Sequence, residues 1–174
     1  MTMEALFSNV ENAISQYEQA CDQEETLYDL IRDAESDMNR YSAQASSAEE
    51  PSDQRAALEQ MREAALRIQD YQNKLQQVQN AKAQAARYLQ ATRSELQNVI
   101  STIEAKLPKF DQSISTFQQM AANPFGGSAS AQIPQLQAKR DEYQRNLNDA
   151  YTLVERIDSA LNGGGSQPQK ILRR

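Results

Sequence analysis

The feature that most constrains this chain is a seven-residue repeat of apolar side chains through residues 55–122. Two rows with this repeat form the buried seam of a coiled coil or a helical bundle. A helix of that extent, rising about 1.5 Å per residue, is too long for one compact core to cover, so other helices must lie along it. The first row consists of Met61, Ile68, Leu75, Lys82, Leu89, Leu96, Ile103, Phe110 and Phe117.

The second row of the long helix runs from Ala64 through Val78 to Val99 and then moves over by one residue to Ile100. This change of phase predicts a change of partner helix near Val99. Pro108 lies further along, and a proline inside a helix normally disrupts it. Because the first row continues through Pro108, we predict one long helix with a kink there.

A first helix is predicted at residues 3–46, where apolar side chains fall in three rows and not two. The polar segment 46–53 contains Pro51, and Ser52 or Asp53 is expected to cap the long helix at its N-terminus. This segment is short enough to force an antiparallel hairpin. The third row of the first helix holds Phe7, Ile14, Cys21 and Tyr28.

The clearest break in the chain is the segment 123–134, in which Asn123 precedes a proline and Gly126-Gly127 favour irregular backbone. A last helix is expected from about Pro134 to Asn162, with a row that includes Leu147, Val154 and Leu161. Three consecutive glycines from Gly163 then end it.

These segments together predict an all-α fold, an elongated antiparallel coiled coil or helical bundle. It is built on one long kinked helix, about 55–122, with flanking helices at about 3–46 and 134–162. Residues 1–162 are expected to form a single domain, and residues 163–174 a flexible, glycine-rich basic tail.

The residue types that usually carry catalysis are scarce. The chain has no histidine, which removes the commonest general base and the usual ligands of di-iron bundles, and its glycine clusters match no phosphate-binding spacing. We therefore expect no enzyme, no cofactor, no metal site and no small-molecule substrate. The single cysteine, Cys21, cannot form an internal disulfide and is expected to pack in the core.

Charge is distributed unevenly, and it limits the class of partner. Residues 1–54 contain thirteen acidic and two basic side chains, whereas residues 55–162 contain eleven acidic and thirteen basic ones. The acidity argues against nucleic acid, and no stretch approaches the ~20 apolar residues of a membrane span. With no signal-peptide pattern, a cytoplasmic protein is expected, and export by a route without a cleaved signal stays open.

Two charged residues interrupt the apolar rows, Glu24 in the first helix and Lys82 in the long one. They are compatible with a functional polar pair, but side chains that set the register of the helices, or that extend to solvent, are the preferred interpretation.

Two short segments resemble known recognition signals. Asn123-Pro124-Phe125 resembles the peptide bound by EH domains, although an Asn-Pro turn with Phe125 against the end of the bundle is the preferred interpretation. Tyr151-Thr-Leu-Val-Glu155 resembles the export signal of ESX-type secretion substrates, whose Trp-x-Gly turn is impossible here because the chain has no tryptophan. The sequence therefore indicates no family.

The leading hypothesis is a non-enzymatic interaction protein, a scaffold, adaptor or assembly subunit, with a protein partner that is most simply a second copy. The candidate interface is the surplus row of the first helix, Phe7, Ile14 and Tyr28. A monomeric three-helix bundle, with the last helix folded back after a break at Pro108, is the competing arrangement. The alternative function is a substrate or dedicated chaperone of a specialised secretion system, with a recognition tail at Lys170, Ile171, Leu172, Arg173 and Arg174.

Overall fold

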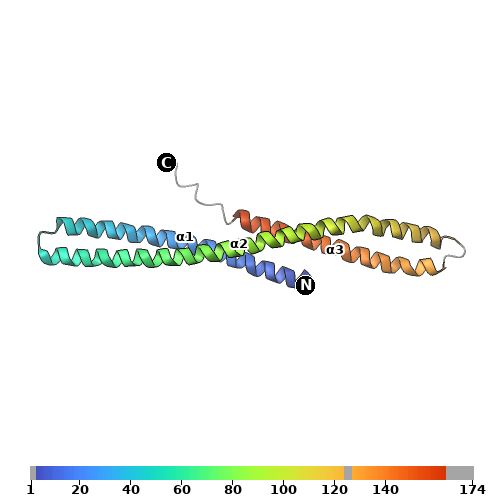
Figure 1. Cartoon of the computed structure of the whole chain (residues 1–174), viewed down its shortest axis with the longest axis horizontal. Coiled ribbons are helices and arrows are strands. Elements are labelled where there is room, and N and C mark those ends of the chain that lie inside the picture. Colours follow the sequence, from blue (N-terminus) through green and yellow to red (C-terminus); the bar gives the residue numbers. More distant parts are fainter. Residues whose placement is uncertain (1–2, 124–126, 164–174) are drawn as a thin grey trace, which may run out of the picture. The chain divides into compact units, whose positions relative to one another are not determined.

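The computed structural model describes residues 3–123 and 127–163, and within them the chain forms three α-helices and no strand (Figure 1). Helix α1 spans Met3–Ser47, α2 spans Pro51–Ala121 and α3 spans Gly127–Gly163. The predicted all-α class and the three predicted helices are confirmed.

Helix α2 begins earlier than predicted, at Pro51, so the expected cap at Ser52 or Asp53 is wrong. Proline is well placed at the first helical position, because the N–H that it lacks would have no partner inside the helix. The Glu50 carbonyl instead accepts the first bond, from the Gln54 amide at 3.1 Å, and Asp53 lies in the first turn, where the helix dipole favours an acid.

Helix α3 also begins earlier than predicted, at Gly127 instead of about Pro134, and Pro134 lies inside it. The part of the predicted break from Gly127 to Pro134 therefore belongs to the helix. The buried Ala129 and the half-buried Ile133 anchor this first part, and their packing offsets the hydrogen bond that proline cannot make. In α2 the helix likewise continues through Pro108, so the break required by the folded-back alternative is absent.

The chain divides into two compact units. The hairpin unit is Ser15–Ala86, and the three-helix unit is formed by the described residues of Met1–Ile14 and Arg87–Arg174. The expectation of a single domain over 1–162 stays a prediction.

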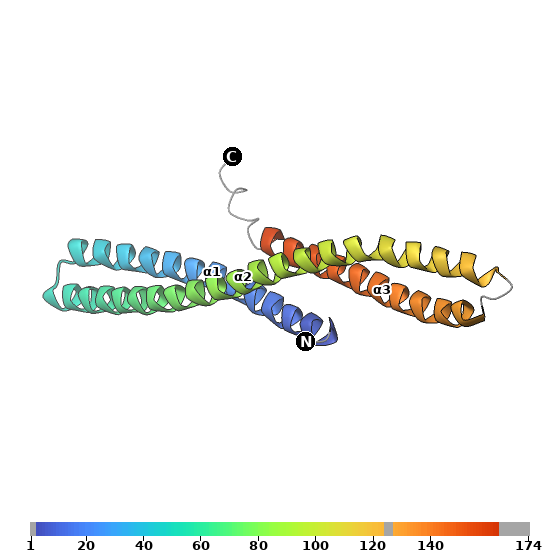
Figure 2. The same cartoon turned by 45° about the vertical axis from the view of Figure 1, so that its right-hand side comes forward.

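In the hairpin unit, the parts of α1 and α2 that belong to it run antiparallel and side by side (Figures 1 and 2). Their contact consists of two rows from each helix. Along the second row, small side chains let the two helices pack closely, and most members of this row are buried. These buried members are Ala20, Leu27, Ala34, Ala57, Ala64 and Ala85. The first row is more open, with half-buried side chains at Glu24, Ile31, Met38, Met61, Ile68, Leu75 and Lys82.

The three-helix unit has a different core, because α3 joins α1 and α2. Among the described residues, the large side chains that are completely buried all belong to this unit: Val10, Leu89, Leu96, Leu153 and Ile157. Arg93 holds α3 to α2 through two bonds to Asp158, at 2.6 and 3.1 Å. Arg156 holds α3 to α1 through two contacts with Glu11, both at 2.7 Å.

Helix lengths account for this third layer. The 45 residues of α1 and the 37 of α3 together exceed the 71 residues of α2, so the two cannot share α2 end to end and must overlap. The predicted change of phase is confirmed within this unit, since Val99 is 41% exposed and Ile100 only 7%. The buried positions move by four residues from Thr92 to Leu96 and by four again from Leu96 to Ile100, where a seven-residue repeat alternates three and four. Two successive steps of four rotate the buried stripe around α2.

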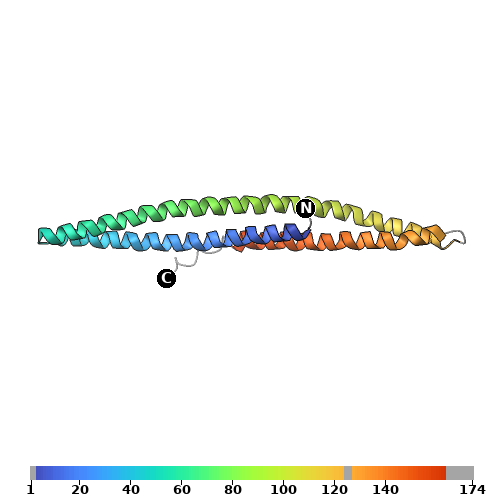
Figure 3. The same cartoon turned by 90° about the horizontal axis from the view of Figure 1, so that it is seen from below.

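Beyond the overlap, α2 and α3 continue as an antiparallel pair (Figure 3). The rings of Phe110 and Tyr143 lie 5.3 Å apart between their centroids, and the Lys106 ammonium lies 5.2 Å from the Tyr143 centroid. Ile103, Ile114 and Leu147 are buried along the same contact.

A further row on α3 went unrecognised in the sequence. Leu153 is fully buried and Ala160 is buried, whereas Val154 and Leu161, on the predicted row, are only half-buried. The reason is that α3 contacts two helices here, so its buried stripe is wider than a two-helix seam.

Substitution of Leu153 by Ala is expected to lower the free energy of unfolding by ~2–5 kcal/mol, because it opens a cavity where three helices meet. Leu161→Ala, the same chemical change at a half-buried site, is expected to cost less than half as much. Urea titrations followed by circular dichroism compare the two variants. Equal losses, or a larger loss for Leu161→Ala, would show that the sequence-predicted row is the buried one.

Candidate functional site

The two charges that interrupt the apolar rows meet in the hairpin unit. The Lys82 ammonium Nζ lies 2.5 Å from Glu24 Oε2, with the side chain of Glu24 17% exposed and that of Lys82 27% exposed. Each occupies a first-row position on its helix, between apolar neighbours at seven-residue spacing. An ion pair therefore stands where the repeat would otherwise place two apolar side chains.

Polar side chains from both helices extend this pair. Gln79 donates from Nε2 to Glu24 Oε1 at 3.2 Å and to the Tyr28 hydroxyl at 3.1 Å. Tyr17 and Cys21 lie on the other side of Glu24 along α1, and their side chains are close enough to hydrogen-bond to each other. The Glu24 carboxylate thus accepts bonds at both oxygens.

The pair holds both groups in their charged forms. Partial burial acts to raise the pKa of the Glu24 carboxyl, but hydrogen bonds from Lys82 and Gln79 outweigh it and place that pKa below its ordinary value of 4.5. The hydrogen bond to Glu24 raises the pKa of the Lys82 ammonium above 10.5, against the opposing effect of burial. Burial raises the pKa of the nearby Tyr17 hydroxyl. At neutral pH this arrangement offers neither a neutral amine nucleophile nor a carboxylic acid donor.

The position of the pair along the helices suits a role in setting the register. Glu24 lies 23 residues before the end of α1 at Ser47, whereas Lys82 lies 31 residues after the start of α2 at Pro51. A hairpin folded symmetrically about its loop would place Glu24 opposite Lys74. Glu24 instead meets Lys82, which lies eight residues further along α2. A polar pair in an apolar seam favours the one register that joins its charges.

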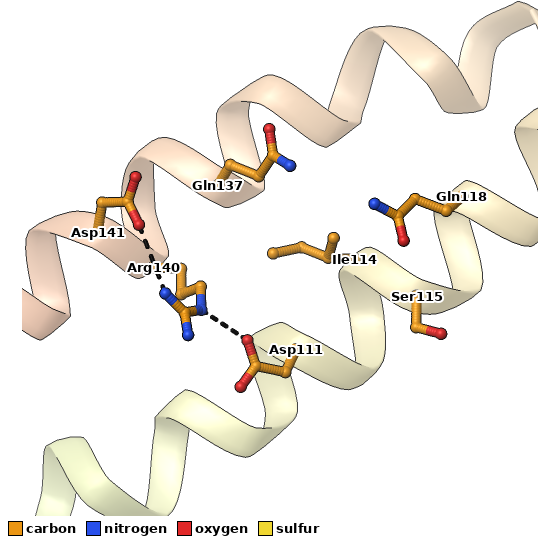
Figure 4. Close-up of a pocket in the computed structure, with 7 residues that line it drawn as sticks. All are labelled: Asp111, Ile114, Ser115, Gln118, Gln137, Arg140 and Asp141. Carbon is orange, nitrogen blue, oxygen red and sulfur yellow. Dashed lines mark hydrogen bonds and ion pairs between the residues drawn. The ribbon is translucent and has the colours of Figure 1, made fainter.

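A second polar cluster lies in the three-helix unit, in an open cleft between α2 and α3 (Figure 4). Arg140 bridges two carboxylates there, with Nε 2.6 Å from Asp111 Oδ1 and Nη1 3.6 Å from Asp141 Oδ1. Ile114 projects from α2 into the space between the two helices (Figure 4), and Ser115, Gln118 and Gln137 complete the lining. Because two acids already neutralise the guanidinium, the cleft is a stabilising contact between helices and not a site prepared for an anion.

The predicted interface residues divide between the two units. Phe7 is half-buried and Ile14 is buried in the three-helix unit, whereas Tyr28 is 48% exposed in the hairpin unit. The expectation that all three form an exposed stripe is wrong for Ile14, which is buried in the unit where α3 packs beside α1. An interface role stays a prediction for Phe7 and Tyr28.

The structure says less about the other candidate residues from the sequence. The tail residues Lys170, Ile171, Leu172, Arg173 and Arg174 lie outside the described residues, as do Pro124 and Phe125. Tyr151 of the export-like motif donates from its hydroxyl to Glu104 Oε1 at 2.5 Å, and Glu155 is exposed.

Two residues of the hairpin unit were missed in the sequence: Gln79, which contacts the polar pair, and Leu58, further along α2. They share one row on α2, seven residues apart through Ala65 and Gln72, directly beside the first row. The only signal for this row is a single leucine among small and polar side chains. The hydrogen bonds of Gln79 and the exposure of Leu58, and not periodicity, identify this row.

Comparison with known protein families, with curated proteins and with solved structures finds no match for this chain. Among the described residues, no helix is both long enough and apolar enough to cross a membrane.

Replacing Glu24 alone by Leu is expected to lower the free energy of unfolding by ~1–3 kcal/mol, because Lys82 stays half-buried without its counter-charge. Replacing Glu24 and Lys82 together by Leu is expected to restore the wild-type value within ~1 kcal/mol or to exceed it. Urea unfolding measures the free energy of unfolding of both variants, and substitution of the exposed Glu18 by Leu serves as the control. If the double variant loses as much as Glu24→Leu and Lys82→Leu combined, the two side chains stabilise the fold independently and do not act as a pair, which contradicts their role in setting the register.

The contribution of the pair to the free energy of unfolding is also expected to depend on pH, and to be lost in both strong acid and strong base. The folded-state pKa of Glu24 is depressed, so its contribution is present above pH 4.5 and is lost as the pH falls through the folded value. The pKa of Lys82 is raised, so its contribution is complete below pH 10.5 and is lost as the pH rises through the folded value. The stability difference between wild type and Glu24→Gln should therefore shrink at both extremes. A difference that stays constant into acid would show that Glu24 is not charged in the folded state.

Proposed function

We propose that this chain is a non-enzymatic interaction protein, a scaffold, adaptor or assembly subunit, that acts through coiled-coil contacts and forms a homodimer. A cytoplasmic setting belongs to the proposal, because a reducing compartment suits a helical chain without disulfides.

The observation that supports association is the contrast between the two cores. The three-helix unit buries five large side chains completely, whereas the buried residues of the hairpin unit are mostly alanines. A pair of helices buries only one narrow stripe, and bulky side chains at its edge stay in contact with water. A four-helix cross-section covers such side chains, and this is the usual solution in helical bundles.

The polar clusters support a structural function for the same chain. The Glu24–Lys82 pair and the Arg140 cleft both consist of charges that neutralise each other between helices. The Glu24–Lys82 pair holds both of its groups in their charged forms, so it leaves neither an acid nor a base poised to exchange a proton near neutral pH. The secretion-substrate alternative rests on sequence alone, since its tail lies outside the described residues, and no observation in the fold favours it.

Sedimentation velocity of the full chain at micromolar concentration tests the proposal. The expected mass is twice the 19.6 kDa of the chain. A mass of 19.6 kDa across the whole accessible range of concentration would overturn the homodimer. Turnover in a broad hydrolase or transferase screen, lost on a single substitution, would overturn the non-enzymatic function independently of the mass.

A further inference from the structure

The two flanks of the hairpin unit differ in how completely they are closed. On the second-row flank, buried alanines bring the helices together, and Arg67 Nη2 lies 3.5 Å from Asp37 Oδ2 across the edge. On the first-row flank the bulky side chains stay half-buried. Six members of the second row are buried, although its bulkier Tyr41, Tyr71 and Val78 stay half-buried. The first row of this unit buries only Tyr17 and Ala45, at its two ends, so its flank is the more open one.

Half-buried and exposed apolar side chains share the first-row flank. The bond from Gln79 to the Tyr28 hydroxyl shows that the row beside the first row of α2 faces the equivalent row of α1. Leu58 lies on the row of Gln79 and is 45% exposed, and Tyr28 borders the surface from α1. The surface, named here the open face, consists of Ile31, Met38, Leu58, Met61, Ile68 and Leu75.

Charge indicates which occupant suits this face. Residues 15–54 contain eleven acidic and two basic side chains, whereas residues 55–86 contain three acidic and five basic ones. A hairpin that is acidic along one helix and basic along the other is complementary to a second copy of itself, provided that each α1 lies against the partner's α2. A two-fold axis parallel to the helices produces that pairing and keeps all neighbouring helices antiparallel.

We propose that the open face packs against the open face of a second copy, with each α1 of the hairpin unit against the partner's α2. This inference rests on the proposed homodimer and specifies its surface and its geometry. A two-fold axis parallel to the helices places equivalent residues at the same level in the two copies. Each Glu24 is then level with residue 82 of the other copy, and the four charges alternate in sign around the centre of the section.

Two exposed leucines on the same helix provide a matched test of the surface. Leu58 belongs to the open face, whereas Leu66, 58% exposed, lies on the side of α2 that faces away from α1. Leu58→Glu is expected to raise the dimer dissociation constant by at least about tenfold, and Leu66→Glu by less than about twofold. Sedimentation velocity over a dilution series measures both constants, and circular dichroism verifies that the variants keep the helix content of the wild type.

The outcomes separate the surface from the function. If both variants dimerise as the wild type does, the open face is not the interface, although the homodimer stands. If Leu66→Glu is the weaker dimer, the opposite side of the hairpin is the interface. If the wild-type chain is monomeric at every concentration, the proposed homodimer is wrong, and so is the assignment of a second copy to this face.

Exchange of the two charges tests the geometry without removing apolar contacts. A chain carrying Glu24→Lys together with Lys82→Glu keeps an ion pair within each copy, and its own homodimer keeps alternating charges. In a mixed dimer with wild type, each residue 24 meets a like charge at residue 82 of the other copy. Native mass spectrometry of an isotopically labelled mixture should therefore show fewer mixed dimers than random exchange gives. A random distribution would overturn the pairing of α1 with the partner's α2.

Discussion

The structure depends on one constraint, the need of each helix to bury a narrow apolar stripe that recurs every three or four residues. Helix α2 carries such a stripe along 71 residues, and no single partner covers it. In the three-helix unit both other helices contribute to its burial, and large side chains disappear completely from solvent. In the hairpin unit only α1 is available among the described residues, and small side chains close one flank while the other stays open.

Much of this could be predicted from the repeat. The three helices, the seam positions and the phase change at Val99 all follow from the spacing of apolar residues, because burial and periodicity report the same physical requirement. The start of α3 could not be predicted in this way. Gly127 and Pro134 are typical of a break, yet packing of Ala129 keeps the segment helical, and tertiary contacts override the local preference.

The same limitation explains the errors at Ile14 and Leu153. Both lie outside a two-helix seam, and both are buried because α1 and α3 overlap along α2. The overlap depends on the true length of α3, which the misleading glycine and proline signals shortened in the sequence interpretation. Similarly, Glu24 and Lys82 are visible as interruptions, but the repeat does not say that they meet. Every shift of seven residues preserves the rows, so periodicity leaves the register open and the ion pair selects one.

The central claim is that the hairpin unit depends on association for its full stability and the three-helix unit does not. Amide hydrogen exchange of the full chain over a dilution series tests it most directly, since mass action removes the partner without altering the sequence. The account predicts that protection falls on dilution in residues 20–80, while residues 89–103 and 147–160 keep theirs. Protection that is independent of concentration in both units, or that falls equally in both, would contradict it.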